Sequence, residues 1–252
     1  MSMTISIITA TYNSAATVRD TFESVLRQTY QEIEYIVVDG ASKDDTVALI
    51  KAYEPRFEGR MRWVSEPDKG LYDAMNKGLR MATGEVVGIL NSDDFYTADD
   101  VLERVAEALR DSRLDAVYGD VHYVHEEDLG HTVRYYSSKR FTRERMRMGS
   151  MPAHPSFYAR RSCYQRYGGF DTDYKIGADF EQLLRLIYVH KIRTRYLAKD
   201  FVTMRMGGVS SSGLKSYWQI IRDHRKAFRR HGVAFNPLLY GWRYVEKLFE
   251  FK

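Results

Sequence analysis

Short apolar runs alternate with amphipathic segments through the first half of the chain. Strands are predicted where β-branched and apolar residues cluster, at Ile5–Ala10, Tyr35–Val38, Arg62–Ser65 and Val86–Leu90. Between them, apolar residues recur at helical spacing. One helix follows Ser14, a candidate N-cap, and its apolar face carries Val18, Phe22, Val25 and Leu26. Further helices are predicted after Asp39, over Leu71–Ala82, and after a second candidate cap, Thr97.

The pattern changes near Asp115. Segments Ala116–His125 and Thr132–Ser137 alternate apolar and polar residues around a polar turn, which predicts an antiparallel pair. A helix is predicted over Ala178–His190 and a strand over Arg193–Met206, before a long basic helix. We expect a nucleotide-sugar-binding half over residues 1–114, an acceptor-facing half over 115–213 and a basic amphipathic tail over 214–252.

Repeated strand–helix order with nearly continuous apolar strands predicts an α/β fold. Its central sheet is expected to be mainly parallel and covered by helices on both faces. Ligands of such sheets bind at the carboxyl ends of the strands. The four predicted strand ends are all polar, and they are Thr9–Asn13, Asp39–Ser42, Glu66–Gly70 and Asn91–Asp94. These ends are therefore candidates for holding a nucleotide or a metal.

Composition narrows the class of protein. The 252 residues are 44% hydrophobic and 29% charged, which is an ordinary globular balance. The chain lacks an apolar run of the roughly 18–20 residues needed to span a bilayer, and its start does not resemble a signal peptide, so we expect a cytosolic protein. The single cysteine, Cys163, excludes an internal disulfide and is expected to be buried.

The stretch "GILNSDDFY", residues 88–96, places two consecutive carboxylates at the end of an apolar strand. Hard oxygen ligands suit Mg²⁺ or Mn²⁺, which commonly take one or two protein carboxylates together with phosphate oxygens. Asp93 and Asp94 are therefore candidate metal ligands. The alternative is that they cap the following helix.

Several motifs occur in an order that resembles a known family. "SIITATYNSAATVRDTFESVLRQTYQEIEYIVVDGASKDDT" is followed by "SEPDKGLYDAMNKGLRMATGEVVGILNSDD" and then "HPSFYARRSCYQRYGGFDTDYKIGADFEQLLRL". Over roughly residues 4–210 the chain resembles the family 2 glycosyltransferases with the GT-A fold. The resemblance implies a nucleotide-sugar donor, a divalent cation and inversion at the anomeric carbon.

The resemblance assigns roles at the first two strand ends. Thr11, Tyr12 and Asn13 match the loop that contacts the nucleotide. Asp39 matches the carboxylate that reads the base, and an acceptor-only side chain can bond a ring N–H such as that of uracil. We therefore expect a UDP-sugar. The alternative for Asp39 is a turn residue before Gly40.

At the next two strand ends, Asp68 matches a donor-site position, and Lys69 is either a phosphate partner or a solvated surface lysine. Asn91 stands where many relatives have aspartate, so it is expected to bond a ribose hydroxyl without adding charge. Ser92 is counted with it among the donor-binding residues. The metal is consequently placed on Asp93, with Asp94 as second choice.

The motif "GADFE" matches the region that supplies the catalytic base. Inversion by direct displacement needs a carboxylate that takes the proton of the acceptor hydroxyl. Asp179 fits this role, whereas Glu181 lies about 200° further around the helix. Asp179 could also cap its own helix.

Two further positions carry alternatives. His154 lies where relatives have a polar residue beside the donor phosphates, but a histidine next to prolines could equally be structural. Residues 207–213, "GGVSSSG", resemble a loop that closes over the donor, with Gly207, Gly208 and Ser210 as its candidate lid residues. A flexible connector is the other reading.

The tail carries a concentrated positive charge. Residues 215–231 hold six Lys or Arg against one Asp, and an aromatic-rich segment with Trp242, Leu248 and Phe249 follows. This pattern is typical of binding to an anionic membrane surface. The alternative is a helix packed on the domain with a solvated basic face. Nucleic-acid binding is not expected, because no reading module accompanies the charge.

Together these features predict a metal-dependent transferase that acts in cell-surface polysaccharide synthesis, on the inner face of the cell membrane. It would move a hexosyl or N-acetylhexosaminyl group to a saccharide or a lipid-linked saccharide. The alternatives are a non-catalytic nucleotide-sugar or carbohydrate-binding protein and a sugar nucleotidyltransferase. The latter needs a glycine-rich basic loop after the first strand, where this chain has "TATYNS". The same stretch excludes a G-x-G-x-x-G dinucleotide enzyme.

Overall fold

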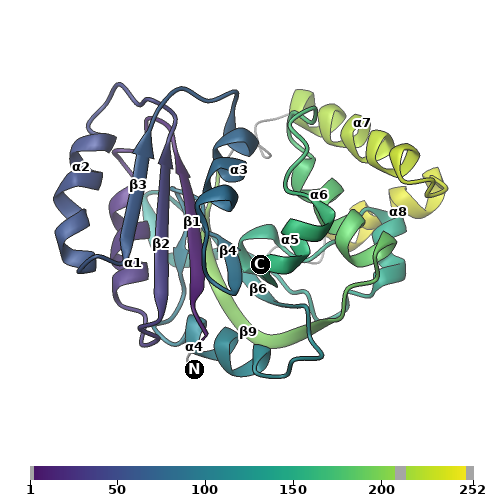
Figure 1. The fold of residues 1–252 in the computed structure, drawn as a ribbon. Helices are drawn as coiled ribbons and strands as arrows, with labels where there is room; N and C mark the ends of the chain where they lie inside the picture. Colours follow the sequence, from purple (N-terminus) through teal and green to yellow (C-terminus); the bar gives the residue numbers. More distant parts are fainter. Residues whose placement is uncertain (1–2, 208–213, 248–252) are drawn as a thin grey trace.

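The fold is that of a computed structural model, which describes residues 3–207 and 214–247. Nine strands form one curled sheet in the order β3-β2-β1-β4-β8-β6-β9-β5, with β7 paired to β6 (Figure 1). The strands are β1 Ile5–Thr11, β2 Ile33–Asp39, β3 Met61–Ser65, β4 Val86–Ile89, β5 Phe95–Tyr96, β6 Ala116–His125, β7 Asp128–Tyr136, β8 Phe157–Arg160 and β9 Thr194–Arg205.

The sheet is mixed rather than mainly parallel. Strands β1 to β4 are parallel to one another, as the sequence predicts. Strand β8 then joins β4 in antiparallel orientation, and β6 joins β8 in the same way. The parallel character is thus confined to the first four strands and to the β6–β9 pair. The sequence predicted neither β8 nor the two-residue β5. Both strands pair in antiparallel orientation, which is why the sheet was expected to be mainly parallel.

Helices cover both faces of the sheet. They are α1 Val18–Leu26, α2 Thr46–Tyr53, α3 Leu71–Met81, α4 Val101–Leu109, α5 Arg161–Tyr167, α6 Ala178–Leu183, α7 Leu214–Arg230 and α8 Pro237–Lys247. One core packs α1, α2 and α4 against side chains such as Ile5 and Ile7. The other packs α3, α5 and α6 against the opposite face, through Ile8. This alternation follows from the two-residue period of a strand.

Two predicted helix caps are wrong. Helix α1 begins at Val18 after Thr17, and Ser14 contributes its carbonyl oxygen rather than a capping hydroxyl. Helix α4 begins after Asp100, and the Thr97 hydroxyl lies 3.3 Å from that of Thr203 on β9. Both helices start three residues later than their candidate caps indicate.

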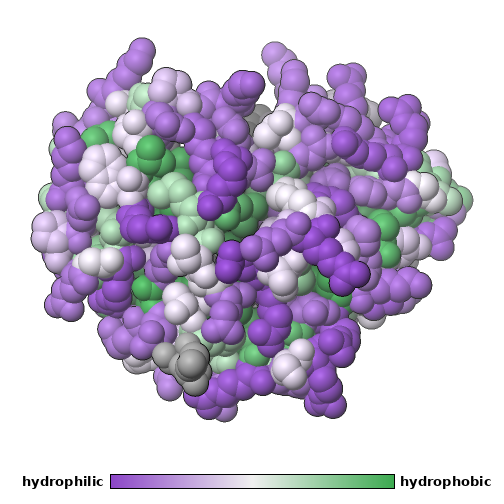
Figure 2. Space-filling model, viewed as in Figure 1, coloured by the Kyte–Doolittle hydropathy of each residue, from purple (hydrophilic) through white to green (hydrophobic). Residues whose placement is uncertain are grey.

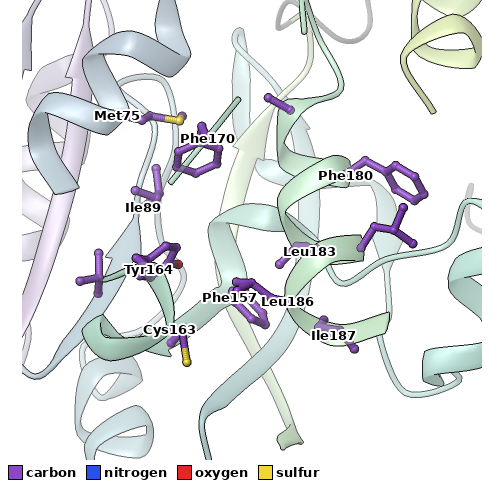
Figure 3. Close-up of a cluster of buried hydrophobic side chains, with 14 of the residues drawn as sticks. Met75, Ile89, Phe157, Cys163, Tyr164, Phe170, Phe180, Leu183, Leu186 and Ile187 are labelled. Atoms are coloured by element: carbon purple, nitrogen blue, oxygen red, sulfur yellow. The ribbon is translucent and has the colours of Figure 1, made fainter. Parts of the chain in front are cut away.

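Cys163 is buried, as predicted. It lies in the core that contains Ile8, among the side chains that α5 and α6 present to β4 and β8 (Figure 3). Burial raises the pKa of its thiol to about 11. The thiolate is the reactive form of cysteine, so a thiol with this pKa serves as a packed core side chain rather than a nucleophile.

Helix α7 shares this core. Ala227 and Phe228 are fully buried, and the Phe180 ring of α6 stacks on His224 of α7 with ring centroids 3.6 Å apart. Tyr240 of α8 packs against the same group, and its hydroxyl lies 3.1 Å from His224 Nδ1. One face of the predicted tail is therefore part of the hydrophobic core.

Candidate active site

The carboxyl ends of β1, β2 and β3 meet at one edge of the sheet. Thr11 pairs with Asp39, and Asp39 pairs with Ser65, at the last residue of each strand. Strand β4 runs beside β1 and leads into the loop that begins at Leu90. The topology thus brings the four predicted strand ends together, because neighbouring parallel strands end on the same side.

Asp39 is fully buried at this edge and both of its carboxylate oxygens are already bonded. Oδ1 accepts hydrogen bonds from the hydroxyls of Thr11 at 3.0 Å and Ser42 at 2.5 Å. Oδ2 accepts from the Ser42 amide at 3.0 Å and from the Ser65 hydroxyl at 2.6 Å. Burial raises the pKa of this carboxyl, but the four donors outweigh it and leave the pKa below its usual value. A carboxylate offers about four acceptor positions, so reading a base N–H would require one of these donors to leave.

Asp68 presents a second carboxylate at the same place. Its Oδ1 accepts the Gly70 amide at 2.8 Å. Its Oδ2 lies directly over Gly40, since a Cβ atom added there would be 2.4 Å from this oxygen and 3.4 Å from Tyr12 Cδ2. The exposed ring of Tyr12, the Gly40 backbone and Asp68 thus surround one position at the end of β2.

The loops after β1, β2 and β4 are joined by polar contacts. Asn13 has a left-handed backbone with φ 50°, and its Oδ1 accepts the Lys43 amide at 2.9 Å. Ala41 is also left-handed, with φ 60°, a conformation that is uncommon for alanine. The hydroxyls of Ser14 and Ser92 lie 2.9 Å apart. Backbone strain of this kind is found where a loop must hold a set position at a site.

The two adjacent carboxylates differ in access. Asp94 is 1% exposed, and its Oδ2 accepts a hydrogen bond from Asn91 Nδ2 at 2.8 Å. Burial first, and then the charge of Asp93, raise the pKa of Asp94 well above its usual value. Asp93 is only partly buried, and burial raises its pKa as well. Asp93 is therefore the carboxylate that a ligand can reach.

Arg205 contacts the Asp93–Asp94 segment, and it was not among the site residues predicted from the sequence. It lies at the end of β9, and one guanidinium nitrogen donates to the Asp93 carbonyl at 2.6 Å. The other terminal nitrogen bonds the carboxylate of Asp20 on α1. Its positive charge lowers the pKa of both Asp93 and Asp94, against the effect of burial. The signal in the sequence is an arginine two residues before the glycines of the predicted lid.

The donor set fits a divalent cation in part. Within residues 3–207 and 214–247, no three His, Cys, Asp or Glu side chains gather as a metal site. Mg²⁺ and Mn²⁺ do not require such a cage, because they bind through one or two carboxylates and complete their coordination with phosphate and water. Asp93, with Asp94 behind it, suits that mode.

Asp179 lies in the first turn of α6 and is partly buried. Its Oδ1 accepts the Phe180 amide at 2.7 Å, and the N-cap of the helix is Gly177. Burial raises the pKa of Asp179 to about 6, and the charge of Asp223 acts in the same direction. A carboxyl with this pKa is ionised at neutral pH and remains a competent base.

Glu181 has a different environment from Asp179. Its carboxylate is buried, bonds Arg185 through two hydrogen bonds of 3.0 Å, and lies 2.7 Å from His231 Nε2. Its partners are Arg185, in the acceptor-facing half, and His231, the residue that follows α7. Glu181 therefore belongs to a structural ion-pair network.

Three other predicted residues have clear positions. His154 is buried, its ring meets that of Phe170 edge-on at 5.3 Å, and burial lowers its pKa to about 4. Lys69 is exposed, and its backbone amide donates to Asp73. Gly207 is left-handed with φ 103°. Gly208 and Ser210 lie outside the described residues, so a lid role for these positions stays a prediction.

Comparison with known proteins gives consistent matches. The family model described as glycosyl transferase family 2 matches residues 6–167. An uncharacterized glycosyltransferase of Mycobacterium tuberculosis is 34% identical over 211 residues, which cover 81% of this chain and 77% of that protein. A PGL/p-HBAD biosynthesis glycosyltransferase of Mycobacterium bovis is 30% identical over 193 residues, covering 76% of this chain and 73% of the relative.

Solved structures with the same fold include S. aureus TarS 1-349 in complex with UDP-GlcNAc. It has a TM-score of 0.71 and 19% identity, and the match covers 92% of this chain and 68% of that one. This chain spans 41% of a longer TarS chain. A mannosyltransferase from Pyrobaculum calidifontis, in complex with GDP-Man and Mn²⁺, has a TM-score of 0.71 and 22% identity, with 97% and 70% coverage. These likenesses confirm the GT-A architecture.

Proposed function

The chain belongs to glycosyl transferase family 2, and on this premise we propose that it is an inverting, metal-dependent hexosyl- or N-acetylhexosaminyltransferase. Its donor would be a nucleotide-diphosphate sugar, with UDP favoured, and its acceptor a hydroxyl of a saccharide or lipid-linked saccharide. One observation carries the proposal. Asp179, with a pKa of about 6, lies just after a loop that contacts α3, and α3 begins directly after Asp68–Gly70.

Asp179 would act as the general base. It accepts the proton of the acceptor hydroxyl while the oxygen forms its bond to the anomeric carbon. At the same time the bond from that carbon to the β-phosphate oxygen breaks, and the nucleoside diphosphate leaves. A single displacement of this kind inverts the configuration.

Asp93 would hold a divalent cation, with Asp94 as the second carboxylate. A bound cation neutralises the pyrophosphate and so stabilises it as a leaving group. The charge of such an ion also favours the ionised forms of both carboxylates, which burial otherwise disfavours. The Mn²⁺ in the P. calidifontis mannosyltransferase complex supports the use of a divalent cation.

The base of the nucleotide would lie where Tyr12, Gly40 and Asp68 meet. Asp68 Oδ2 can accept a ring N–H of uracil, and Asp39 supports the position by fixing the strand ends beneath it. Thr11, Asn13, Asn91, Ser92, Lys69 and His154 remain proposed donor contacts. The TarS complex with UDP-GlcNAc supports a UDP-sugar, whereas the mannosyltransferase complex holds GDP-Man.

The acceptor would be reached at an anionic membrane, with the enzyme on its cytoplasmic face. Helix α7 turns Arg222, Arg225 and Arg229 outward, and Trp218 is 66% exposed beside them. Leu238 and Trp242 of α8 are 86% and 55% exposed. Figure 2 shows hydrophilic residues over α7 with hydrophobic ones next to them at α8. A hollow of about 990 Å³ lies in this same surface, and its lining includes Trp218, Arg222, Arg225 and Arg229.

None of the helices within residues 3–207 and 214–247 is long and apolar enough to cross a bilayer. Attachment would therefore be peripheral, through the basic face and the neighbouring aromatic side chains. A biosynthetic role is supported by the M. bovis relative, whose name refers to PGL/p-HBAD biosynthesis. Cell-surface polysaccharide synthesis is the role that we propose for this chain.

A panel of UDP-, GDP- and TDP-sugars tests the activity directly. Each is incubated with the protein and Mn²⁺, with and without EDTA, and release of the nucleoside diphosphate is measured. We expect slow metal-dependent hydrolysis of a UDP-sugar in the absence of acceptor. Binding without any turnover, in the presence of lipid-linked and free saccharide acceptors, would instead favour a non-catalytic carbohydrate-binding protein.

A further inference from the structure

Helix α7 contributes a buried carboxylate to the region beside Asp179. Asp223 is only 3% exposed. Its Oδ2 accepts the backbone amides of Ile176 at 3.0 Å and Gly177 at 3.1 Å. Its Oδ1 accepts Gln219 Nε2 at 2.8 Å. A buried charge is costly unless it is bonded in this way, so its presence calls for a reason.

The two amides that Asp223 accepts lie at the start of α6. Gly177 is the N-cap of this helix, and Asp179 follows two residues later. Glycine has no side chain, so the N-cap residue itself cannot make a capping bond. The carboxylate from α7, 46 residues away from Gly177 in sequence, instead accepts the amides of the N-cap residue and of the residue before it.

The approach of α7 depends on a glycine. A Cβ atom at position 177 would lie 2.9 Å from Asp223 Cβ and 3.6 Å from His224 Cδ2. Any other residue would therefore push α7 away from the loop. The glycine in "IGADFE" is thus explained by packing against Asp223.

Ile176 is held on both sides by side chains of other elements. Its amide bonds Asp223 of α7, and its carbonyl oxygen accepts the hydroxyl of Tyr72 from α3. Asp223 and Tyr72 act electrostatically on Asp179 from these packed elements, and the titratable ring of His224 on α7 stacks on the adjacent Phe180. Glu181, on the same helix as Asp179, is paired with Arg185 and His231.

We propose that Asp223 is a positioning residue for Asp179: by bonding the amides of Ile176 and Gly177, it holds the loop that aims the base. The inference rests on the proposed role of Asp179 as the base. A purely structural role would affect folding alone, whereas a positioning role alters turnover in a protein that remains folded.

Two variants of Asp223 separate the effect of its hydrogen bonds from the effect of its negative charge. Asp223→Asn keeps an oxygen that can accept both amides and, with Gln219 turned over, retains the third bond, but it removes the negative charge. We expect kcat at pH 8 to stay within about threefold of wild type. The acidic limb of the kcat–pH profile should move to lower pH by roughly half a unit to one unit, because a like charge near Asp179 has gone.

Asp223→Ala removes the bonds as well. We expect kcat to fall roughly tenfold to a hundredfold, since a displacement of about 1 Å at a catalytic group can have that effect. Donor affinity, measured by calorimetry with UDP and Mn²⁺, should stay within about twofold, because Asp223 contacts none of the donor loops. Glu107→Gln, which removes an exposed carboxylate on α4 away from the proposed sites, is the control and should leave kcat and its pH profile unchanged.

Circular dichroism and thermal unfolding accompany each variant. If Asp223→Ala does not fold, Asp223→Glu decides, because it keeps the charge but moves the carboxylate away from the two amides by one methylene group: wild-type kcat in that variant would overturn the proposal. A folded Asp223→Ala enzyme with wild-type kcat would overturn it equally. Full activity in Asp179→Asn would be a separate result, since it would contradict the proposed base rather than the contact from α7.

Discussion

The hydroxyl of Tyr72 donates a hydrogen bond to the carbonyl oxygen of Ile176. Tyr72 lies in the first turn of α3, directly after the Asp68–Gly70 loop, and Ile176 lies three residues before Asp179. One bond thus connects the proposed donor site to the segment that carries the proposed base. The Tyr72 ring also stacks on Phe170, with centroids 5.7 Å apart, and this stacking orients the Tyr72 hydroxyl toward Ile176.

Tyr72→Phe should lower kcat while the protein stays folded. The variant keeps the ring stacking, and it removes the hydroxyl's bond to the Ile176 carbonyl together with its contacts to the backbone of Ala178 and Asp179. Loss of a buried hydrogen bond of this kind lowers the free energy of unfolding by about 1–2 kcal/mol. We expect kcat to fall roughly threefold to tenfold, with the affinity for UDP unchanged. Equal kcat in the two proteins would show that this contact does not align the base.

The pH profile of turnover should report Asp179. Its raised pKa of about 6 means that the carboxylate, the active form, is lost as the pH falls through that value. We therefore expect kcat to rise from pH 5 to about pH 7 and then level off. Asp179→Asn should reduce kcat by roughly 10²–10⁴ and remove this limb, with donor affinity little changed. A large loss of donor affinity with normal kcat would make Asp179 a binding residue.

Asp93→Ala should abolish transfer and the Mn²⁺-dependent part of donor binding. Asp93 is the more accessible of the adjacent carboxylates, so the cation loses its proposed ligand. Calorimetry of UDP with and without Mn²⁺ measures the effect, and Asp99→Ala, an exposed carboxylate further along the chain, is the control. Transfer at near wild-type level in Asp93→Ala would move the metal elsewhere.

Gly40→Ala should weaken donor binding through Asp68. The added methyl group would lie 2.4 Å from Asp68 Oδ2, so that side chain must turn away. We expect UDP affinity to fall about tenfold, equivalent to about 1.4 kcal/mol, with little change in Tm. In an Asp68→Ala background the same substitution should have almost no further effect, because contacting residues are not additive. An equal effect in both backgrounds would show that Asp68 is not involved.

The same calorimetry tests the choice of base. A carboxylate that accepts a ring N–H favours uracil, and we expect UDP to bind more tightly than TDP or GDP in the presence of Mn²⁺. Guanine also offers N–H donors, so GDP is the demanding comparison. Tighter binding of GDP would overturn the preference for a UDP-sugar.

Membrane binding should depend on the outward face of α7. Each Lys or Arg near an anionic surface contributes about 1 kcal/mol, so reversing Arg222, Arg225 and Arg229 to Glu should lower vesicle binding at least about a hundredfold. Sedimentation with phosphatidylglycerol-containing vesicles, against neutral ones, measures it. Deleting the helix would confuse the result, because Ala227, Phe228 and Tyr240 lie in the core.

The control reverses three exposed basic residues elsewhere, Lys51, Arg80 and Arg110, so that the net charge changes equally. Lys51 lies on α2, at the opposite end of the molecule from α7 (Figure 1). Equal binding of both triple variants to anionic vesicles would rule out α7 as the membrane contact.

Periodicity alone was enough to predict the donor half of the fold. Strands β1 to β4 and the helices between them follow from apolar runs and helical spacing, since each signal is local. Their parallel order then requires the polar ends to converge, which marks these ends as candidate ligand sites, whereas the roles expected of Asp39 and Asp68 came from the resemblance to the family 2 glycosyltransferases. The two-residue β5 is too short to show a period, and β8 runs directly into α5 without a turn between them, so neither strand was predicted. The sheet is mixed because β8 pairs antiparallel with both β4 and β6.

Tertiary structure decided which of those groups are available and what supports them. The sequence could not show that Thr11, Ser42 and Ser65 fill the acceptor positions of Asp39, because the three residues lie on or after different strands. The contacts of Asp223 with Gly177 and of Arg205 with Asp93 join residues 46 and 112 positions apart. Local patterns determine which elements form, whereas contacts at such separations depend on how the finished sheet and helices pack.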